Sequence, residues 1–274
     1  MSTSETKAPT RIDRPRSLAS GPLAMRLFLL DFQRQLRSKK ALMILLIQLL
    51  PVVVGGIFLF SQSLDGLTLF RNTVDNVYLP FLLPLAALFF GGPTIVNEIE
   101  GRTITYLTLR PISRAPIYLA KLASSITTAL VITILPVLIF FALCQFGSSD
   151  ELSFGLTYLG PALLSVALGT IAYTSLFAAL GVLTGATLLL GVIYFVIMEM
   201  ILATVPVVEL VSVKFHLRTI VGTQGADRAG FLSQLILDEP LAFEWWVGVL
   251  VTGAFALAAI IAGTLIFKEK QHHV

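Results

Sequence analysis

The sequence has 274 residues, of which 56% are apolar and only 13% are charged, with a formal net charge of +3. Soluble domains carry charge on about 25% of their residues, so these figures exclude an ordinary soluble globule, and a disordered or coiled-coil chain would be more polar still. The mean hydropathy of +0.88 instead favours an all-α protein that crosses a membrane several times.

The first 40 residues precede any long apolar stretch. Residues 1–21 are rich in Ser, Thr, Pro and Arg, so we expect a flexible cytoplasmic tail before a transmembrane domain at 22–270. Residues 22–40 can form an amphipathic helix that lies in the headgroup layer of the membrane, although Asp31 does not fit its pattern. The apolar stripe comprises Met25, Leu29, Phe32 and Leu36, and the polar stripe comprises Arg26, Gln33, Arg37 and Lys40.

Six stretches are apolar over about 20 residues, which is the length that crosses about 30 Å of hydrocarbon. They are residues 41–60, 77–96, 117–146, 158–181, 186–207 and 245–267. Fifteen of the nineteen Lys and Arg residues lie before the first span, in the segment 97–121 that includes the base of the third span, or after the sixth span. Because basic residues concentrate on the cytoplasmic side, both termini are predicted to be cytoplasmic. The positive charge therefore follows membrane topology and gives no reason to expect a nucleic-acid partner.

The loop between the second and third spans, residues 97–121, is long and polar. A connector needs only about 5 residues, and here Pro111 can end one short helix while Ser113 can cap another. This favours a cytoplasmic projection that docks on a soluble partner and transmits motion. A solvated loop that only satisfies helix ends is the alternative. The charges of the segment are Glu98, Glu100, Arg102, Arg110, Arg114 and Lys121.

This segment resembles the cytoplasmic signature of the ABC-2 type permeases, which are transmembrane subunits of ATP-binding cassette transporters. The pattern E-x-E-G-R-T-x-x-Y-L-x-x-R-P-x-S-R-x-x-I-x-x-x-K is formed here by Glu98, Glu100, Gly101, Arg102, Thr103, Tyr106, Leu107, Arg110, Pro111, Ser113, Arg114, Ile117 and Lys121. The resemblance extends over nearly the whole chain, through an interfacial N-terminal helix, six spans, a short turn between spans four and five, and a longer outer segment before span six.

The resemblance implies a permease subunit of an exporter in a bacterial or archaeal cell membrane. Two cytoplasmic ATPase subunits per complex would bind ATP and Mg²⁺, and a second copy of this chain or a sister permease would complete a dimer among the membrane lipids. Residues 208–244 would form re-entrant or interfacial helices that close the exit. A coupling helix would be seated in the ATPase through Glu98, Glu100, Gly101, Arg102, Arg110, Pro111 and Arg114.

Motifs for chemistry within the chain itself are missing from the sequence. It contains no GxxxxGK[ST] phosphate loop, no HExxH pair and no Cys cluster, so we expect no catalytic residues, no cofactor and no metal site in this chain. Two other classes stay open. A secondary transporter driven by an ion gradient would show paired charges in the membrane and an inverted repeat, and an intramembrane enzyme would need a convergent set of catalytic groups.

Polar residues inside the predicted spans are the candidates for a translocation path. Glu199 lies about midway along the fifth span, where a charged carboxylate costs several kcal/mol. It either lines a wet path or is protonated and hydrogen-bonded across the seam of a dimer in a purely structural role. Gln48 in the first span is a weaker candidate of the same kind, and the sequence does not decide between the two roles for either residue.

Overall fold

The computed structural model describes residues 20–60, 65–93, 114–146, 152–184, 187–201, 208–222 and 243–269, and these ranges are helical and contain no strand. The α-helices are α1 (Ser20–Leu36), α2 (Lys39–Phe60), α3 (Gly66–Thr73), α4 (Leu83–Gly91), α7 (Arg114–Phe146), α8 (Leu152–Thr184), α9 (Thr187–Tyr194), α10 (Val213–Val221) and α12 (Trp245–Glu269). Two π-helices, η1 (Val74–Leu82) and η2 (Phe195–Ile201), and one 3-10 helix, η4 (Val208–Val211), complete the set.

Five helical stretches are long and apolar enough to cross a membrane, and each contains most of one predicted span. They are Lys39–Leu59, Gly66–Gly91, Ala115–Phe146, Gly155–Thr184 and Trp245–Glu269. Their lengths of 21 to 32 residues match or exceed what the hydrocarbon layer requires. The expectation of an all-helical integral membrane protein is therefore confirmed for the described part of the chain.

The predicted fifth span at 186–207 is only partly described. The apolar helix Thr187–Glu199 in this region is shorter than a span, and residues 202–207 lie outside the described ranges. The sixth crossing therefore remains a prediction.

The second spanning stretch begins at Gly66 instead of Val77, because Asp65 caps the start of α3. The Asp65 side chain accepts hydrogen bonds from the backbone N–H groups of Leu67 and Thr68, which a helix leaves without partners in its first turn. The helix then continues through the π-turns of η1 into α4. Arg71, expected in a loop, is consequently a helical residue of α3.

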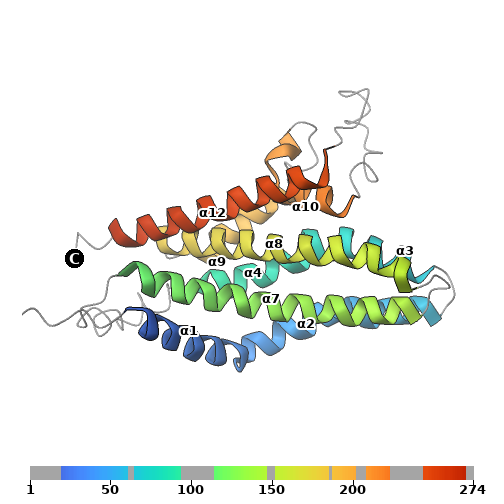
Figure 1. Ribbon diagram of the computed structural model, residues 1–274, viewed down its shortest axis with the longest axis horizontal. Helices are drawn as coiled ribbons and strands as arrows, with labels where there is room; N and C mark the ends of the chain where they lie inside the picture. Colours follow the sequence, from blue (N-terminus) through green and yellow to red (C-terminus); the bar gives the residue numbers. More distant parts are fainter. Residues whose placement is uncertain are drawn as a thin grey trace, which may run out of the picture.

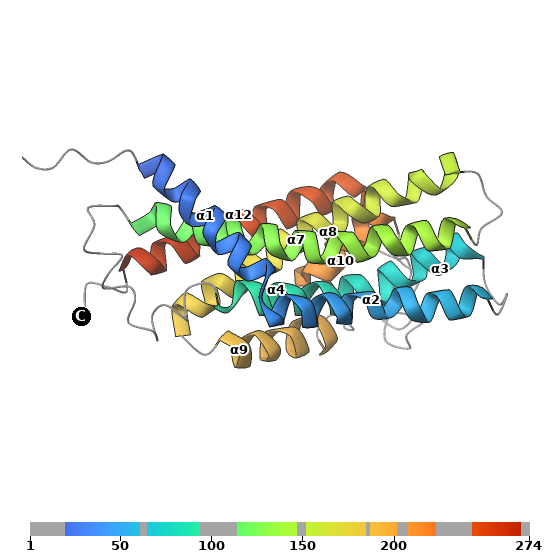
Figure 2. The ribbon, with the colours of Figure 1, turned by 90° about the horizontal axis from the view of Figure 1, so that it is seen from below.

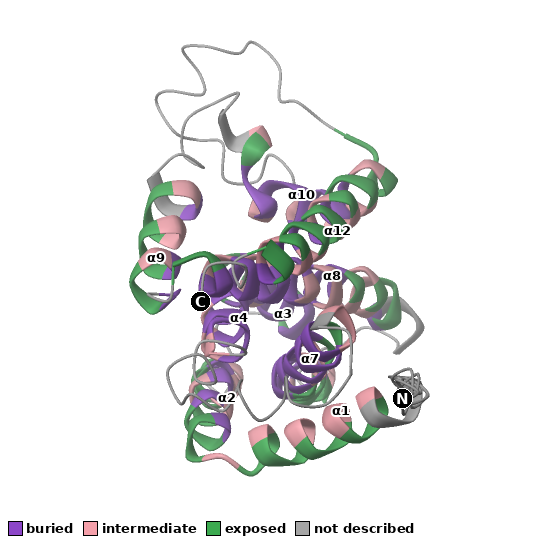
Figure 3. Cartoon of the chain, turned by 90° about the vertical axis from the view of Figure 1, so that its left-hand side faces the viewer, coloured by how far each residue is buried: buried purple, intermediate pink, exposed green. Residues whose placement is uncertain are grey.

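Helix α8 forms the centre of the bundle, with α4, α7, α10 and α12 packed around it (Figures 1 and 3). The main core cluster joins residues of α3, η1, α4, α7, α8, α10 and α12. Helices α2 and α12 also keep broad apolar faces exposed, as helices in lipid do. Helices α8 and α12 run in the same direction (Figure 1). Their last turns meet beside the first turns of α7, where Phe267 packs with Tyr118 and Val182.

Helix α1 lies across α7 at the end of the bundle where α7 begins (Figure 2). Three residues of its predicted apolar stripe, Met25, Leu29 and Leu36, are exposed and face away from the bundle. An exposed apolar stripe next to a polar face matches the pattern expected for an interfacial helix.

Candidate functional site

Most of the predicted coupling residues lie outside the described part of the chain. These are Glu98, Glu100, Gly101, Arg102, Arg110 and Pro111. Arg114 is the first residue of α7, and its side chain is not among those described. The structure therefore establishes only that α7, a spanning helix of 33 residues, follows this segment directly.

Gln48 joins two helices in the interior of the bundle. Its side chain is buried, and its amide nitrogen donates a hydrogen bond of 2.9 Å to the carbonyl oxygen of Leu82 at the end of η1. The hydroxyl of Tyr78 donates to the carbonyl oxygen of Gln48 over 3.0 Å, so the contact is reciprocal. No described contact links Gln48 to Glu199. This arrangement favours the structural role for Gln48.

Glu199 lies in η2 with only 2% of its surface exposed. The hydroxyl of Ser212 donates a hydrogen bond of 2.6 Å to its Oε2 atom. Its other oxygen, Oε1, has no hydrogen-bond partner in the described part of the chain. The hydroxyls of Tyr173 on α8 and Tyr194 on α9 lie within electrostatic range of the carboxyl group. Glu199 is thus held on one side and left open on the other.

The carboxyl group of Glu199 sits at the start of α10. Ser212 is the N-cap residue of this helix, but its hydroxyl bonds to Glu199 and makes no capping bond of its own. The free N–H groups in the first turn of a helix carry a partial positive charge, which favours a nearby negative group. The N-terminus of α10 therefore supplies part of the positive charge that this buried acid requires.

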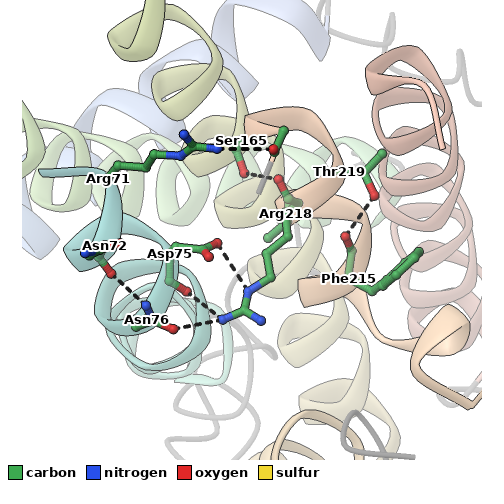
Figure 4. Close-up of polar contacts among 10 residues, drawn as sticks. Arg71, Asn72, Asp75, Asn76, Ser165, Phe215, Arg218 and Thr219 are labelled. Carbon is green, nitrogen blue, oxygen red and sulfur yellow. Dashed lines mark hydrogen bonds and ion pairs between the residues drawn. The ribbon is translucent and has the colours of Figure 1, made fainter. Parts of the chain in front are cut away.

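A second polar cluster, which the sequence did not single out, holds the other end of α10 (Figure 4). The guanidinium of Arg218 forms an ion pair with Asp75 on η1, with 3.2 Å between Nε and Oδ1. It also donates to the Asn76 side chain and to the Asp75 carbonyl oxygen, at 3.1 and 3.3 Å. Arg71 on α3 donates to the carbonyl oxygen of Gly222, which follows α10. The opposite charges of the pair were visible in the sequence, but only the fold brings them together.

Helix α10 therefore connects the two π-helices through acidic side chains. Its first residues contact Glu199 on η2, and its last turn contacts Asp75 on η1. The π-helices also touch each other directly, because the rings of Phe81 and Phe195 meet edge to face with centroids 5.8 Å apart. π-helical turns are less stable than α-helical ones and occur frequently at functional sites. This junction of η1, η2 and α10 is the candidate functional site of the described chain.

A third polar contact fixes α1 to the first turns of α7. The amide nitrogen of Gln35 donates to Asp31 over 2.6 Å and to the hydroxyls of Ser124 and Ser125 over 3.3 and 3.2 Å. The Ser124 hydroxyl donates to the same Asp31 oxygen over 3.1 Å. Asp31, which breaks the amphipathic pattern of residues 22–40, is therefore the residue that attaches α1 to the bundle.

Replacing Asp31 by alanine is expected to loosen α1. The substitution removes the acceptor for both Gln35 and Ser124, and a lost charge-assisted hydrogen bond costs about 1.5 to 3 kcal/mol. Hydrogen exchange at the backbone amides of α1 should become at least about tenfold faster, which corresponds to about 1.4 kcal/mol. The exposed Gln33 is the control, because Gln33→Ala should leave exchange unchanged. Equal exchange in wild type and Asp31→Ala would contradict this role.

Comparison with known protein families gives a match that spans most of the chain. A family model described as "Protein of unknown function (DUF2705)" covers residues 41–268. The chain belongs to the DUF2705 family. A comparison with curated proteins finds no match. The DUF2705 match begins after α1, so it includes Gln48, Glu199 and the Asp75–Arg218 pair and leaves out Asp31.

The polar chemistry of this DUF2705 chain lies in paired contacts between helices. Among the described residues, no group of three or more His, Cys, Asp or Glu side chains could hold a metal ion. His216 on α10 is directed to the protein backbone, and its Nε2 atom donates to the carbonyl oxygen of Leu210 over 2.8 Å. The arrangement can hold α10 in place and can present one carboxyl oxygen, that of Glu199, to a ligand.

Proposed function

We propose that this chain is the transmembrane subunit of an ATP-binding cassette exporter of the ABC-2 type, driven by ATP hydrolysis in separate cytoplasmic subunits. The observation that carries the proposal is the pattern from Glu98 to Lys121, which ends inside the first turns of α7. A docking segment continuous with a 33-residue spanning helix is suited to transmit a push from a soluble partner into the membrane.

The six-span topology of the proposal is supported by the directions of the helices. Helices α8 and α12 run in parallel, so the chain has to return across the membrane between Thr184 and Trp245 (Figure 1). The helix formed by α9 and η2 is the described apolar segment available for that return. Residues 187–201 reach about 22 Å as a helix, so a crossing of about 30 Å would also need residues 202–207.

The position of α10 also suits the proposal. Residues 208–244 are expected to close the exit, and α10 is buried against α8 and α12. The carbonyl oxygen of His216 would lie only 2.5 Å from a Cβ added to Gly248 of α12, so these two backbones are in close contact. In the proposed cycle, motion entering at α7 opens this contact and releases α10.

The coupling assignment predicts the effect of a double charge reversal. Glu100→Lys with Arg114→Glu should abolish docking of the ATPase that co-purifies from native membranes, or reduce its substrate-stimulated ATP hydrolysis at least about tenfold, because opposite charges at the contact become like charges. Glu244→Lys, at the other end of the bundle, is the matched control and should retain coupling. Membrane insertion should be normal in both variants. Full docking and full stimulation in the double variant would contradict the coupling assignment.

One observation favours a second candidate, a secondary transporter driven by an ion gradient. Glu199 is a buried acid without an ion pair among the described residues, and such acids take part in ion-coupled transport. The two candidates differ in their energy source. Transport by vesicles with an imposed proton gradient and no ATP would support the second, whereas transport that requires ATP and not the gradient supports the first.

A further inference from the structure

The open oxygen of Glu199 is the starting point, because a half-satisfied acid in this position is costly. The carboxyl group is buried, Ser212 satisfies only Oε2, and Oε1 has no hydrogen-bond partner in the described part of the chain. Within those same residues no Lys or Arg forms an ion pair with it. A negative charge inside a membrane protein requires a positive partner or water. Among the described residues, the groups that favour a negative charge here are the Ser212 hydroxyl, the N-terminus of α10 and the neighbouring hydroxyl of Tyr173.

The surroundings of Glu199 are aromatic. The rings of Tyr173 and Phe177 stack with centroids 6.2 Å apart, and the ring of Tyr194 meets Phe177 edge to face at 6.1 Å. Tyr194 lies five residues before Glu199, about one turn along the π-helix η2, so its ring lies on the same side of the helix as the carboxyl group, and Phe177 and Tyr173 continue the aromatic cluster from there. Aromatic faces attract organic cations, most strongly where water is excluded. A carboxylate beside aromatic rings therefore favours a ligand in which a positive charge is attached to apolar groups.

In the described ranges, only one helical segment, formed by α9 and η2, lies between this site and the membrane. Helix α9 buries only Thr187 and Gly191, and it stands at the edge of the bundle (Figure 3). The outward side chains of α9 and η2 are apolar and exposed: Leu188, Leu189, Val192, Ile193, Val196 and Ile197. Glu199 is buried on the inward side of this same helical segment, so a small outward movement of the segment would bring the carboxyl group within reach of an amphipathic molecule in the membrane.

We propose that Glu199 anchors a binding site for an amphipathic organic cation, such as an apolar amine, quaternary ammonium or phosphonium ion. The positive charge neutralises the carboxylate on its Oε1 side, and the apolar groups pack on Tyr173, Phe177 and Tyr194. A neutral molecule would leave the carboxylate without a counter-charge, and an anion would be repelled. That this cation is also the transported cargo rests on the proposed function.

Binding to the purified full-length protein tests the site without ATP and without transport. Tetraphenylphosphonium and tetraphenylborate have closely similar shapes and opposite charges, and each is measured separately by equilibrium dialysis. The wild-type protein should bind the cation saturably, at one site per chain, and should bind the anion at least about tenfold more weakly. Equal affinity for the two ions would overturn the proposal, and this comparison requires no variant.

Two variants and one control locate the site. Glu199→Gln should weaken tetraphenylphosphonium binding at least tenfold, and Tyr194→Leu, which keeps the carboxyl group but removes a ring, should weaken it about threefold. Glu244→Gln is the matched control, because Glu244 is exposed before α12 and should not affect binding. Wild-type affinity in Glu199→Gln would overturn the proposal. Glu199-dependent binding, together with native membranes in which no ATPase subunit associates with this chain, would support the site and contradict the proposed function alone.

Discussion

Replacing Arg218 by methionine is expected to lower the free energy of unfolding by about 3 kcal/mol, because it removes the ion pair from the buried Asp75 carboxylate. The exposed fractions of the two side chains are 16% for Arg218 and 6% for Asp75, so water cannot replace the lost contact. Removing one member of a buried ion pair costs about 3 to 5 kcal/mol, and the small exposure of Arg218 places the effect at the lower end.

The double variant Arg218→Met with Asp75→Leu distinguishes the loss of the ion pair from the other effects of substituting Arg218. Replacing both charges by apolar groups also removes the buried carboxylate, so the double variant should be more stable than Arg218→Met alone. Arg71→Met is the control, because Arg71 contacts only the Gly222 carbonyl oxygen and, at 5.8 Å, the ring of Tyr158 among the contacts described, and should cost less than about 1 kcal/mol. Unfolding measured by steric trapping in bicelles gives these differences. Equal losses in Arg218→Met and Arg71→Met would contradict the role given to the pair.

Replacing Gly91 by alanine is expected to destabilise the bundle by about 3 kcal/mol, the upper end of the range for overpacking. A Cβ at this position would lie 2.5 Å from the carbonyl oxygen of Thr174 and 3.1 Å from its Cα atom. Both atoms belong to the backbone of α8, so no side-chain rotation relieves the clash and α4 has to move away from the central helix. Small residues at helix contacts in membranes permit this close approach.

The control for Gly91 is Gly253 on α12. A Cβ added there meets nothing within 4 Å, and alanine favours a helix over glycine by about 1 kcal/mol. Gly253→Ala should therefore be neutral or slightly stabilising in the same steric-trapping measurement. A loss for Gly91→Ala no larger than that for Gly253→Ala would show that α4 and α8 are not in the close contact described.

Hydropathy was sufficient to predict the helical class and most of the five spanning stretches, because a long apolar run in a chain of this composition seldom forms anything other than a spanning helix. It placed the start of the second stretch too late, since residues 66–76 are polar on one face and their buried residues, such as Leu69 and Phe70, alternate with exposed ones. Periodicity similarly marked residues 22–40 as an amphipathic helix and left the purpose of Asp31 unexplained.

The junction around α10 could be predicted only in part. Glu199 was identifiable because an acid within an apolar run is rare. Its partner Ser212 was not, and neither was the pairing of Arg218 with Asp75, because these residues are 143 positions apart and a charge count treats them as loop residues. The π-helical turns also lack a sequence signal of their own.

If a separate ATPase drives this chain, the complex isolated from native membranes has to contain it. Native mass spectrometry of the protein purified from its own membranes should detect two ATP-hydrolysing subunits, each with a GxxxxGK[ST] phosphate loop, together with two permease chains. A complex that contains this chain and no nucleotide-binding subunit, yet still transports in vesicles without ATP, would contradict the account.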